Sequence, residues 1–251
     1  MTAMQAESIC EHLEWDSQFF GRRIARVKGS FLTETDIVNI RNWCEDHRID
    51  CLYFLADSTD AQTSRLAENN SFNLVDIRVT LELTLKAERA PNQARLNVRG
   101  ALEQDIPTLK TIARASHRDS RFYYDGNFPT FLCDALYEVW IERSCRGWAK
   151  KVLVAEEGGE AVGYISCHLP TPTTGKIGLV GVGQKVQNKG LGKNLVCEAL
   201  RWFKEQGLES VTVVTQGRNV RAQRLYQRCG FVTRNVEIWF HKWFLDKSGK
   251  A

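Results

Sequence analysis

The stretch Gln187-Asn188-Lys189-Gly190-Leu191-Gly192-Lys193 decides the fold of this chain, because it predicts a tight turn from a strand into a helix. Glycine allows the backbone to turn sharply, and the first N–H groups of a helix have no partner within it. The positive end of the helix dipole and the lysines favour an anion. The sequence therefore predicts a diphosphate-binding loop at 187–193.

Two other glycine-rich motifs that bind phosphates, the Walker loop and the dinucleotide fingerprint, do not match the sequence here. A Walker loop requires glycine where Gln187 stands, and the run Gly181-Val182-Gly183 lacks the third glycine of a dinucleotide fingerprint because Val186 occupies that position. For the loop alone, a surface turn without a ligand remains the alternative.

A second pattern follows at Asn219 and Tyr226, on a predicted helix that Gly230 ends. Their spacing is about two helical turns, which places both side chains on one face. Either residue alone has an ordinary explanation, since asparagine often caps a helix and tyrosine often packs in a core. Together with the loop they indicate one ligand site in two halves.

The surrounding pattern alternates strands and helices. Strands are expected at 22–27, 50–56, 74–85, 95–101, 151–156, 161–168, 176–182, 210–214 and 238–243. Helices are expected at 33–47, 60–69, 105–116, 130–143, 190–206 and 219–229, with Thr33, Asp60 and Asp105 as starts. The fold class is thus α/β (α+β), with a mixed central sheet flanked by helices.

The polar segment 86–93, which contains Pro91, predicts a boundary between a small N-terminal α/β domain at 1–90 and a second domain at 94–251. Residues 64–72 also align without gaps on 223–231, with Ala67 where the second copy has Tyr226. The first domain is therefore a candidate degenerate copy of the same pattern. The alternative is that any helix ending before a strand produces such a match.

Composition narrows the class of protein. With 43% hydrophobic residues and a net charge of +4 spread along the chain, a small anionic ligand is favoured over nucleic acid. The eight cysteines form no C-x-x-C pair and no metal-ligand spacing with the five histidines, so no metal is expected. Because no apolar run has the length of a membrane span and residues 1–16 lack a signal-peptide core, we expect a cytoplasmic protein without membrane contact.

The pattern Gln-x-x-Gly-x-Gly, then Asn-x-x-Ala-x-x-x-Tyr-x-x-x-Gly-Phe, resembles the GNAT superfamily of acyltransferases over about 95–243. The resemblance implies acetyl-CoA as co-substrate and a pantetheine arm paired with the backbone at Val180 and Val182. It also implies a backbone amide near Val182 that polarises the thioester carbonyl. The implied cofactor-binding residues further include Gln187, Asn188, Lys189, Gly190, Leu191, Gly192, Lys193 and Asn219.

The resemblance makes Tyr226 the general acid that protonates the departing thiolate. Proton transfer from a phenol of pKa about 10 to a thiolate of about 8.5 is uphill by about 2 kcal/mol, which favours a concerted or assisted transfer. No residue stands out as the base. His117, Asp119, Glu138 and His168 are candidates, although each has a surface or core explanation, and a water chain could suffice.

A narrower resemblance is to acetyltransferases of the dTDP-fucosamine type, and it rests on Leu13–Gly21, Thr215–Asn219 and the small preceding domain. It implies N-acylation of a dTDP-amino sugar, with a homodimer as a further expectation. Arg121, Tyr123 and Tyr124 are the candidate substrate-binding residues, unless that segment merely connects two helices. The alternatives are an acetyltransferase of protein N-termini, lysines or small-molecule amines, and a CoA-binding module without catalysis.

Overall fold

The computed structural model describes residues 8–85, 97–187 and 189–244, which form two compact units. Unit 1 contains the chain up to Arg78, Tyr124–Phe128, and the chain from Val236 onward; unit 2 contains Val79–Tyr123 and Pro129–Asn235. The predicted boundary segment 86–93 lies outside the described residues, so the division at 1–90 and 94–251 stays a prediction.

Unit 1 is a small α/β unit. Its elements are β1 (Cys10–His12), α1 (Glu14–Phe20), β2 (Ile24–Val27), α2 (Glu34–Asp46), β3 (Cys51–Asp57) and α3 (Ala61–Asn69), with parts of β4 (Asn73–Thr84) and β10 (Val232–Trp243). The strands are hydrogen-bonded in the order β1-β2-β3-β10, with β2 parallel to β3 and the other two pairs antiparallel.

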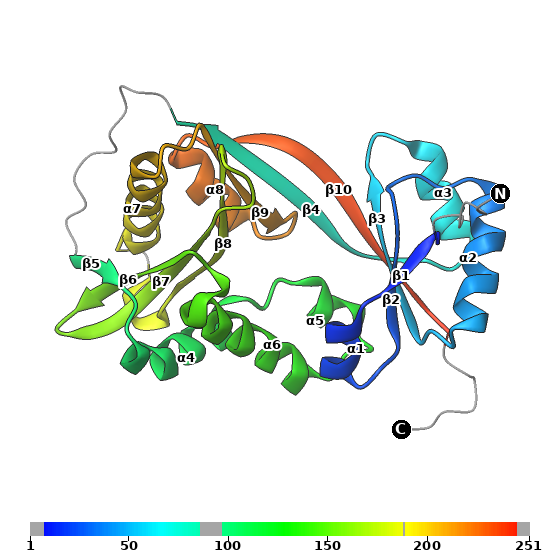
Figure 1. Ribbon diagram of the computed structural model, residues 1–251, viewed down its shortest axis with the longest axis horizontal. Coiled ribbons are helices and arrows are strands. Elements are labelled where there is room, and N and C mark those ends of the chain that lie inside the picture. Colours follow the sequence, from blue (N-terminus) through cyan, green and yellow to red (C-terminus); the bar gives the residue numbers. More distant parts are fainter. Residues whose placement is uncertain (1–7, 86–96, 188, 245–251) are drawn as a thin grey trace, which may run out of the picture. The chain divides into compact units, whose positions relative to one another are not determined.

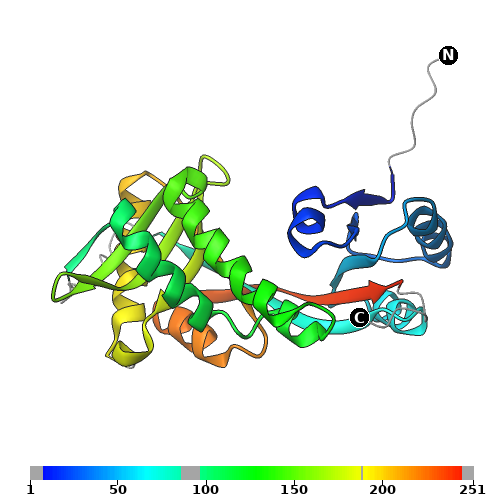
Figure 2. The same ribbon diagram turned by 90° about the horizontal axis from the view of Figure 1, so that it is seen from below.

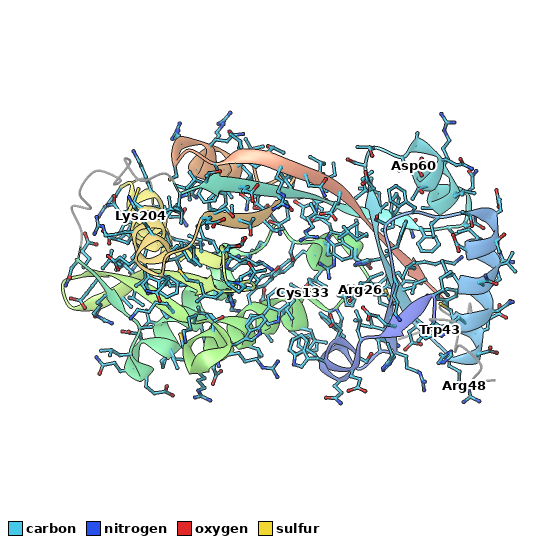
Figure 3. All side chains as sticks on the ribbon, turned by 45° about the horizontal axis from the view of Figure 1, so that its top comes forward. Arg26, Trp43, Arg48, Asp60, Cys133 and Lys204 are labelled. Atoms are coloured by element: carbon cyan, nitrogen blue, oxygen red, sulfur yellow. The ribbon has the colours of Figure 1, made fainter. Side chains whose placement is uncertain are left out.

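The predicted helix starts in unit 1 are confirmed. Thr33 accepts from the N–H of Asp36, whose carboxylate accepts from the Thr33 N–H in return, and this capping box fixes the start of α2. Asp60, labelled in Figure 3, accepts from the N–H of Thr63 at 3.1 Å and caps α3. Neither β1 nor α1 was predicted.

Unit 2 holds the larger part of the fold. Its elements are β5 (Asn97–Gly100), α4 (Ile106–Ser116), α6 (Thr130–Arg143), β6 (Lys151–Glu157), β7 (Glu160–His168), β8 (Thr174–Val182), α7 (Leu191–Glu205), β9 (Ser210–Gln216) and α8 (Val220–Arg228). The short helix α5 (Arg121–Asp125) is divided between the two units. The strand order is β10-β4-β9-β8-β7-β6-β5. Helices α4 and α6 lie side by side below the sheet in Figure 1, and α7 lies above it (Figure 2).

Helix α7 forms where the sequence predicted it. Gly190 stands before the helix with φ +81°, a left-handed conformation that favours glycine. The predicted apolar stripe is buried against the sheet: Leu191, Leu195, Val196, Ala199, Leu200 and Phe203. This packing holds the N-terminus of α7 at the end of β8.

Two details of unit 2 differ from the prediction. The carboxylate of Asp105 does not cap α4, because it accepts from the N–H of Leu102 at 2.8 Å and pairs with Arg99 at 2.7 Å. The short helix α5 was not predicted either. The hairpin at Gly158-Gly159 is confirmed, and both glycines have positive φ.

The match between residues 64–72 and 223–231 has a structural counterpart. Helices α3 and α8 have nine residues each, and each leads into a strand of twelve residues, β4 or β10. The N–H of Phe72 bonds the carbonyl of Ala67 at 3.0 Å, and Phe231 bonds that of Tyr226 at 3.1 Å. Descent from one ancestral pattern stays a prediction.

No helix among the described residues is long and apolar enough to span a membrane. In the same part of the chain, no cluster of three or more His, Cys, Asp or Glu side chains is arranged to hold a metal ion.

Candidate functional site

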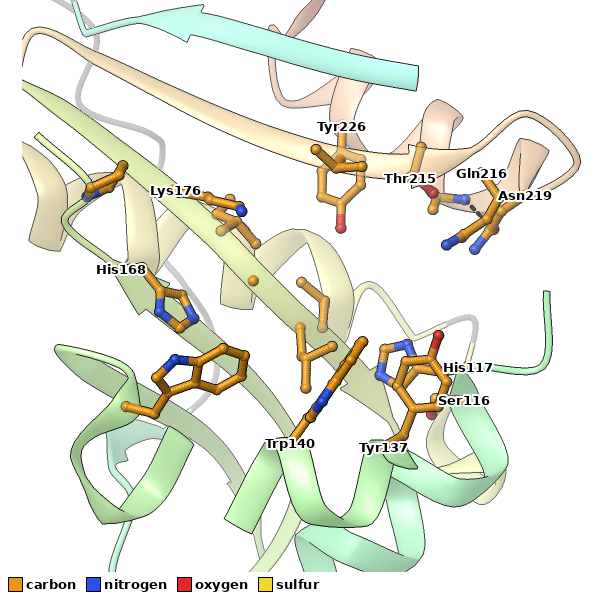
Figure 4. Close-up of a pocket in the computed structure, with 18 of the residues that line it drawn as sticks. Ser116, His117, Tyr137, Trp140, His168, Lys176, Thr215, Gln216, Asn219 and Tyr226 are labelled. Carbon is orange, nitrogen blue, oxygen red and sulfur yellow. Dashed lines mark hydrogen bonds between the residues drawn. The ribbon is translucent and has the colours of Figure 1, made fainter. Parts of the chain in front are cut away.

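The candidate site lies in unit 2, where the parallel strands β8 and β9 separate. They pair from Thr174 with Ser210 to Ile177 with Val213, and the pairing ends there. A pocket of about 750 Å³ opens at this point, lined by both strands and by residues of α4, α6 and α8 (Figure 4). The separation therefore exposes the backbone edge of β8.

A bulge in β8 lies at the same place. Ile165 of β7 pairs with Val180 and Cys167 pairs with Ile177, so Gly178 and Leu179 together oppose Ser166. The buried hydroxyl oxygen of Ser166 accepts the N–H of Leu179 at 2.8 Å. This bond gives the displaced N–H a partner and fixes the bulge.

The edge of β8 that faces away from β7 includes Val180 and Val182, where the sequence predicted backbone contacts with a ligand. The N–H of Leu179 points toward β7, and N–H directions alternate along a strand, so those of Val180 and Val182 point to the opposite edge. The carbonyl of Val182 accepts from Nε2 of Gln187 at 3.1 Å. Val180 lines the pocket. Both valines thus lie where an extended ligand could pair with the strand.

The loop before α7 offers open N–H groups. Gly190 provides no side-chain cap, so the first N–H groups of α7 are available to an anion. Lys189 lies 3.6 Å from Glu157, and Lys193 is exposed. Asn188 lies outside the described residues. The predicted anion loop therefore has suitable backbone and charge.

Gln187 has a structural role that the sequence did not indicate. Its Oε1 accepts a hydrogen bond of 2.7 Å from Arg221 of α8, while its Nε2 bonds β8. Arg221 itself was missed, although it comes two residues after Asn219 and carries a charge at the loop. Gln187 thus connects the loop to α8 and to β8.

Helix α8 presents Asn219 and Tyr226 to the pocket, on one face as the spacing predicted. Asn219 caps the helix by accepting from the N–H of Ala222 at 3.0 Å. The Tyr226 hydroxyl points into the pocket (Figure 4) and has no hydrogen bond to another residue that the structure describes. Burial raises the pKa of Tyr226, so the phenol keeps its proton at neutral pH.

The opposite wall of the pocket is aromatic and cationic. It comprises His117, Tyr137, Trp140, Trp148, Lys150 and His168, while Lys176 of β8 also lines the pocket. Trp148 is 58% exposed and is the last residue of the π-helical turn Ser144–Trp148, in which Gly147 has φ +105°. Nothing in the sequence pattern singled out Trp140 or Trp148, because the turn that directs Trp148 to the pocket depends on this local break in the helix.

The candidate bases have different surroundings. His117 bonds the hydroxyl of Tyr164 at 2.9 Å and stacks on Tyr137, and burial lowers its pKa to about 4. Burial, and then the charge of Lys176, lower the pKa of His168. Asp119 lines the pocket, whereas Glu138 is outside its lining and lies 3.6 Å from Arg114.

The predicted substrate-binding residues are not brought together in this pocket. The Tyr123 hydroxyl donates to Asp134 at 2.7 Å, and the Arg121 guanidinium lies over the ring of Phe122 at 4.4 Å. Tyr124 belongs to unit 1 and is exposed. The substrate-binding role of Arg121, Tyr123 and Tyr124 stays a prediction.

Comparison with known proteins agrees with this geometry. Residues 114–231 match the acetyltransferase (GNAT) family. The chain is 26% identical to the dTDP-fucosamine acetyltransferase of Escherichia coli O6:H1 over 95% of its length and 100% of that protein. It is 27% identical to the spore coat polysaccharide biosynthesis protein SpsD of Bacillus subtilis, over 55% of the chain and 48% of the relative.

A solved GCN5-related N-acetyltransferase from Sphaerobacter thermophilus has the same fold, with a TM-score of 0.66 at 16% identity over 93% of this chain and 76% of that one. The family match covers β7, β8, α7, β9 and α8, which together form the opened strand edge, the anion loop and Tyr226. Residues 114–231 are therefore an acetyltransferase domain of the GNAT family, and the chain that carries them is an acetyl-CoA-dependent N-acyltransferase.

Proposed function

We propose that the chain transfers an acetyl group from acetyl-CoA to the amine of a nucleotide-linked amino-dideoxy sugar. The carrying observation is the pocket that joins the opened edge of β8 to the aromatic and cationic wall. The pantetheine arm pairs with the backbone of Val180 and Val182, and the CoA pyrophosphate lies on the loop 187–193. The donor thereby reaches the bulge at Gly178 and Leu179 with its thioester.

The acceptor lies against the opposite wall. The rings of Trp140 and Trp148 have centroids 6.5 Å apart and offer faces for a sugar or a nucleobase. Lys150 and Lys176 line the same pocket and suit the phosphates of a nucleotide. The names of two relatives support this acceptor: one is a dTDP-fucosamine acetyltransferase, and the other is a spore coat polysaccharide biosynthesis protein.

In this proposal Tyr226 is the general acid. The amine nitrogen bonds to the thioester carbonyl carbon and gives up one proton to a base, the C–S bond breaks, and the phenol proton passes to the departing sulfur. Because burial raises the pKa of Tyr226, a stepwise transfer to a free thiolate is more uphill than for an exposed phenol. The proton therefore moves as the C–S bond breaks.

The test measures CoA thiol release from acetyl-CoA with a dTDP-linked amino sugar, the same sugar without the nucleotide, an aminoglycoside and a peptide with a free N-terminus and a lysine. The proposal requires the highest kcat/KM for the nucleotide-linked sugar and a large loss when the nucleotide is removed. Activity confined to the peptide or the aminoglycoside would overturn the acceptor assignment, and binding of CoA without any transfer would support the non-catalytic module.

The same assay with propionyl-CoA in place of acetyl-CoA tests whether the chain also transfers a longer acyl group. The homodimer and the cytoplasmic location stay predictions from the sequence.

A further inference from the structure

We propose that His168 is the general base that removes the proton from the attacking amine. This role deepens the proposed acyl transfer and rests on it. His168 ends β7 and lines the pocket on the wall opposite Tyr226 (Figure 4). An acceptor amine that approaches the thioester from the aromatic wall therefore passes this ring.

The His168 ring is connected to the bulge. Side chains alternate along a strand, so Tyr164, Ser166 and His168 share one face of β7. Nε2 of His168 lies 3.4 Å from the Ser166 hydroxyl oxygen, which also accepts the N–H of Leu179. The ring thus stands directly beside the bulge, to which the proposed path of the pantetheine arm brings the thioester, and not beside the amide near Val182 that the sequence suggested.

Gly178 leaves the space that the ring occupies. A Cβ atom at this position would lie 2.5 Å from Nε2 of His168 and 2.6 Å from the Ser166 hydroxyl oxygen, closer than real contacts allow. Only glycine at the bulge therefore permits the ring to approach the strand so closely. The bulge and the histidine form one arrangement.

The surroundings of the ring favour a neutral imidazole. Burial has the largest effect and lowers the pKa of His168, the charge of Lys176 on β8 lowers it further, and a hydrogen bond with the backbone of Trp148 acts in the opposite direction. Lys150 also lines this pocket, and Asp119, His117 and Tyr226 line it as well. A neutral ring at physiological pH can accept a proton.

His117, the other histidine in the pocket, is less suited to this role. Its Nε2 already bonds the Tyr164 hydroxyl, and its ring stacks on Tyr137 with centroids 4.6 Å apart. These contacts are those of a core histidine that supports the wall.

With His168 as base and Tyr226 as acid, every proton in the reaction is accounted for. The amine nitrogen attacks the carbonyl carbon, and its proton passes to Nε2 of His168. The C–S bond then breaks and the sulfur takes the proton of Tyr226. After release of the amide and CoA, His168 returns one proton to solvent and Tyr226 regains one, so the net reaction is amine plus acetyl-CoA to amide plus CoA.

The test compares His168→Gln with His117→Gln and with His47→Gln, an exposed histidine of unit 1. His168→Gln should lower kcat about 10²- to 10⁴-fold, with the Kd for acetyl-CoA changed less than about twofold. The wild type should lose kcat on acidification as His168 gains a proton, and this acid limb should be absent in His168→Gln. His47→Gln should match the wild type, and His117→Gln should keep the acid limb.

A kcat of His168→Gln within about threefold of the wild type, or an unchanged acid limb, would overturn the base assignment. If the nucleotide-linked sugar is refused but another amine is acetylated, the proposed acceptor fails while the same comparison on the accepted amine decides the role of His168. Independently of any acceptor, an NMR titration assigned with His168→Gln should show a neutral His168 ring at pH 7; a charged ring overturns the proposal.

Discussion

Nη1 of Arg221 donates a hydrogen bond of 2.7 Å to Oε1 of Gln187, and this bond connects α8 to the loop before α7. Through its Nε2, Gln187 also bonds the carbonyl of Val182, so one side chain connects the three segments that carry the proposed donor site. The anion loop is therefore positioned by α8 as well as by its own helix.

Arg221→Ala should weaken acetyl-CoA binding. The variant removes a hydrogen bond worth about 0.5 to 1.5 kcal/mol, together with a positive charge near the loop, so KM for acetyl-CoA should rise about 3- to 30-fold. The kcat should change less than about twofold, because Arg221 is outside the pocket lining. Steady-state kinetics measure both values. Arg224→Ala on the same helix is the matched control; an equal KM in the two variants would contradict the role of Arg221.

Tyr226→Phe should lower kcat about 10²- to 10⁴-fold, because it removes the proton donor and retains the ring. The phenylalanine would still pack against Phe231, whose ring centroid lies 5.8 Å away. The fold and the Kd for CoA should therefore be preserved, as circular dichroism and calorimetry would show. Tyr53→Phe, the same change at a buried tyrosine of unit 1, serves as control. Turnover within twofold of the wild type would remove Tyr226 from the mechanism.

Gly178→Ala should lower kcat at least about tenfold by forcing the His168 ring or the bulge to move. The added methyl group would otherwise lie 2.5 Å from Nε2 of His168. Gly100→Ala is a suitable control, because its Cβ would meet only the flexible end of Lys151, at 3.2 Å. Kinetics and thermal unfolding of both variants check this: if Gly178→Ala turned over as fast as Gly100→Ala, the close fit of ring and bulge would not matter for the reaction.

The sequence predicted those parts of the site that depend on local patterns. Helix α7 follows from its apolar stripe and from a glycine at positive φ, and the shared face of Asn219 and Tyr226 follows from helical geometry. Each of these features is set by residues close together in the chain. A single sequence is enough to find them.

The remaining features depend on contacts between distant segments. The bulge at Gly178 arises from the register of β8 against β7, which an alternating pattern does not reveal. The sequence made Tyr123 a candidate substrate-binding residue because its side chain is aromatic and polar, but its hydroxyl bonds Asp134. Residues 124–128 join unit 1 because Asp125 bonds His241 and Trp243, more than a hundred residues later. No periodicity in the sequence indicates such a pairing.

Asp125→Asn should destabilise unit 1 and change its response to acid. Burial alone would raise the pKa of Asp125, but the hydrogen bonds from His241, Trp243 and Asn127 outweigh it and lower that pKa. A carboxylate with a lowered folded-state pKa stabilises above its unfolded value of about 4, and this stability is lost as the pH falls through the folded pKa.

The unfolding free energy of the wild type should therefore exceed that of Asp125→Asn by about 1 to 3 kcal/mol at pH 7, and the difference should shrink as the pH falls below about 4. Urea unfolding at pH 7, 5, 4 and 3 measures it. Asp46→Asn, at the exposed end of α2, should follow the wild type at every pH. The difference in unfolding free energy between wild type and Asp125→Asn could instead stay constant from pH 7 to pH 3. Neutral hydrogen bonds alone, and not the carboxylate charge, would then hold residues 124–128 to β10.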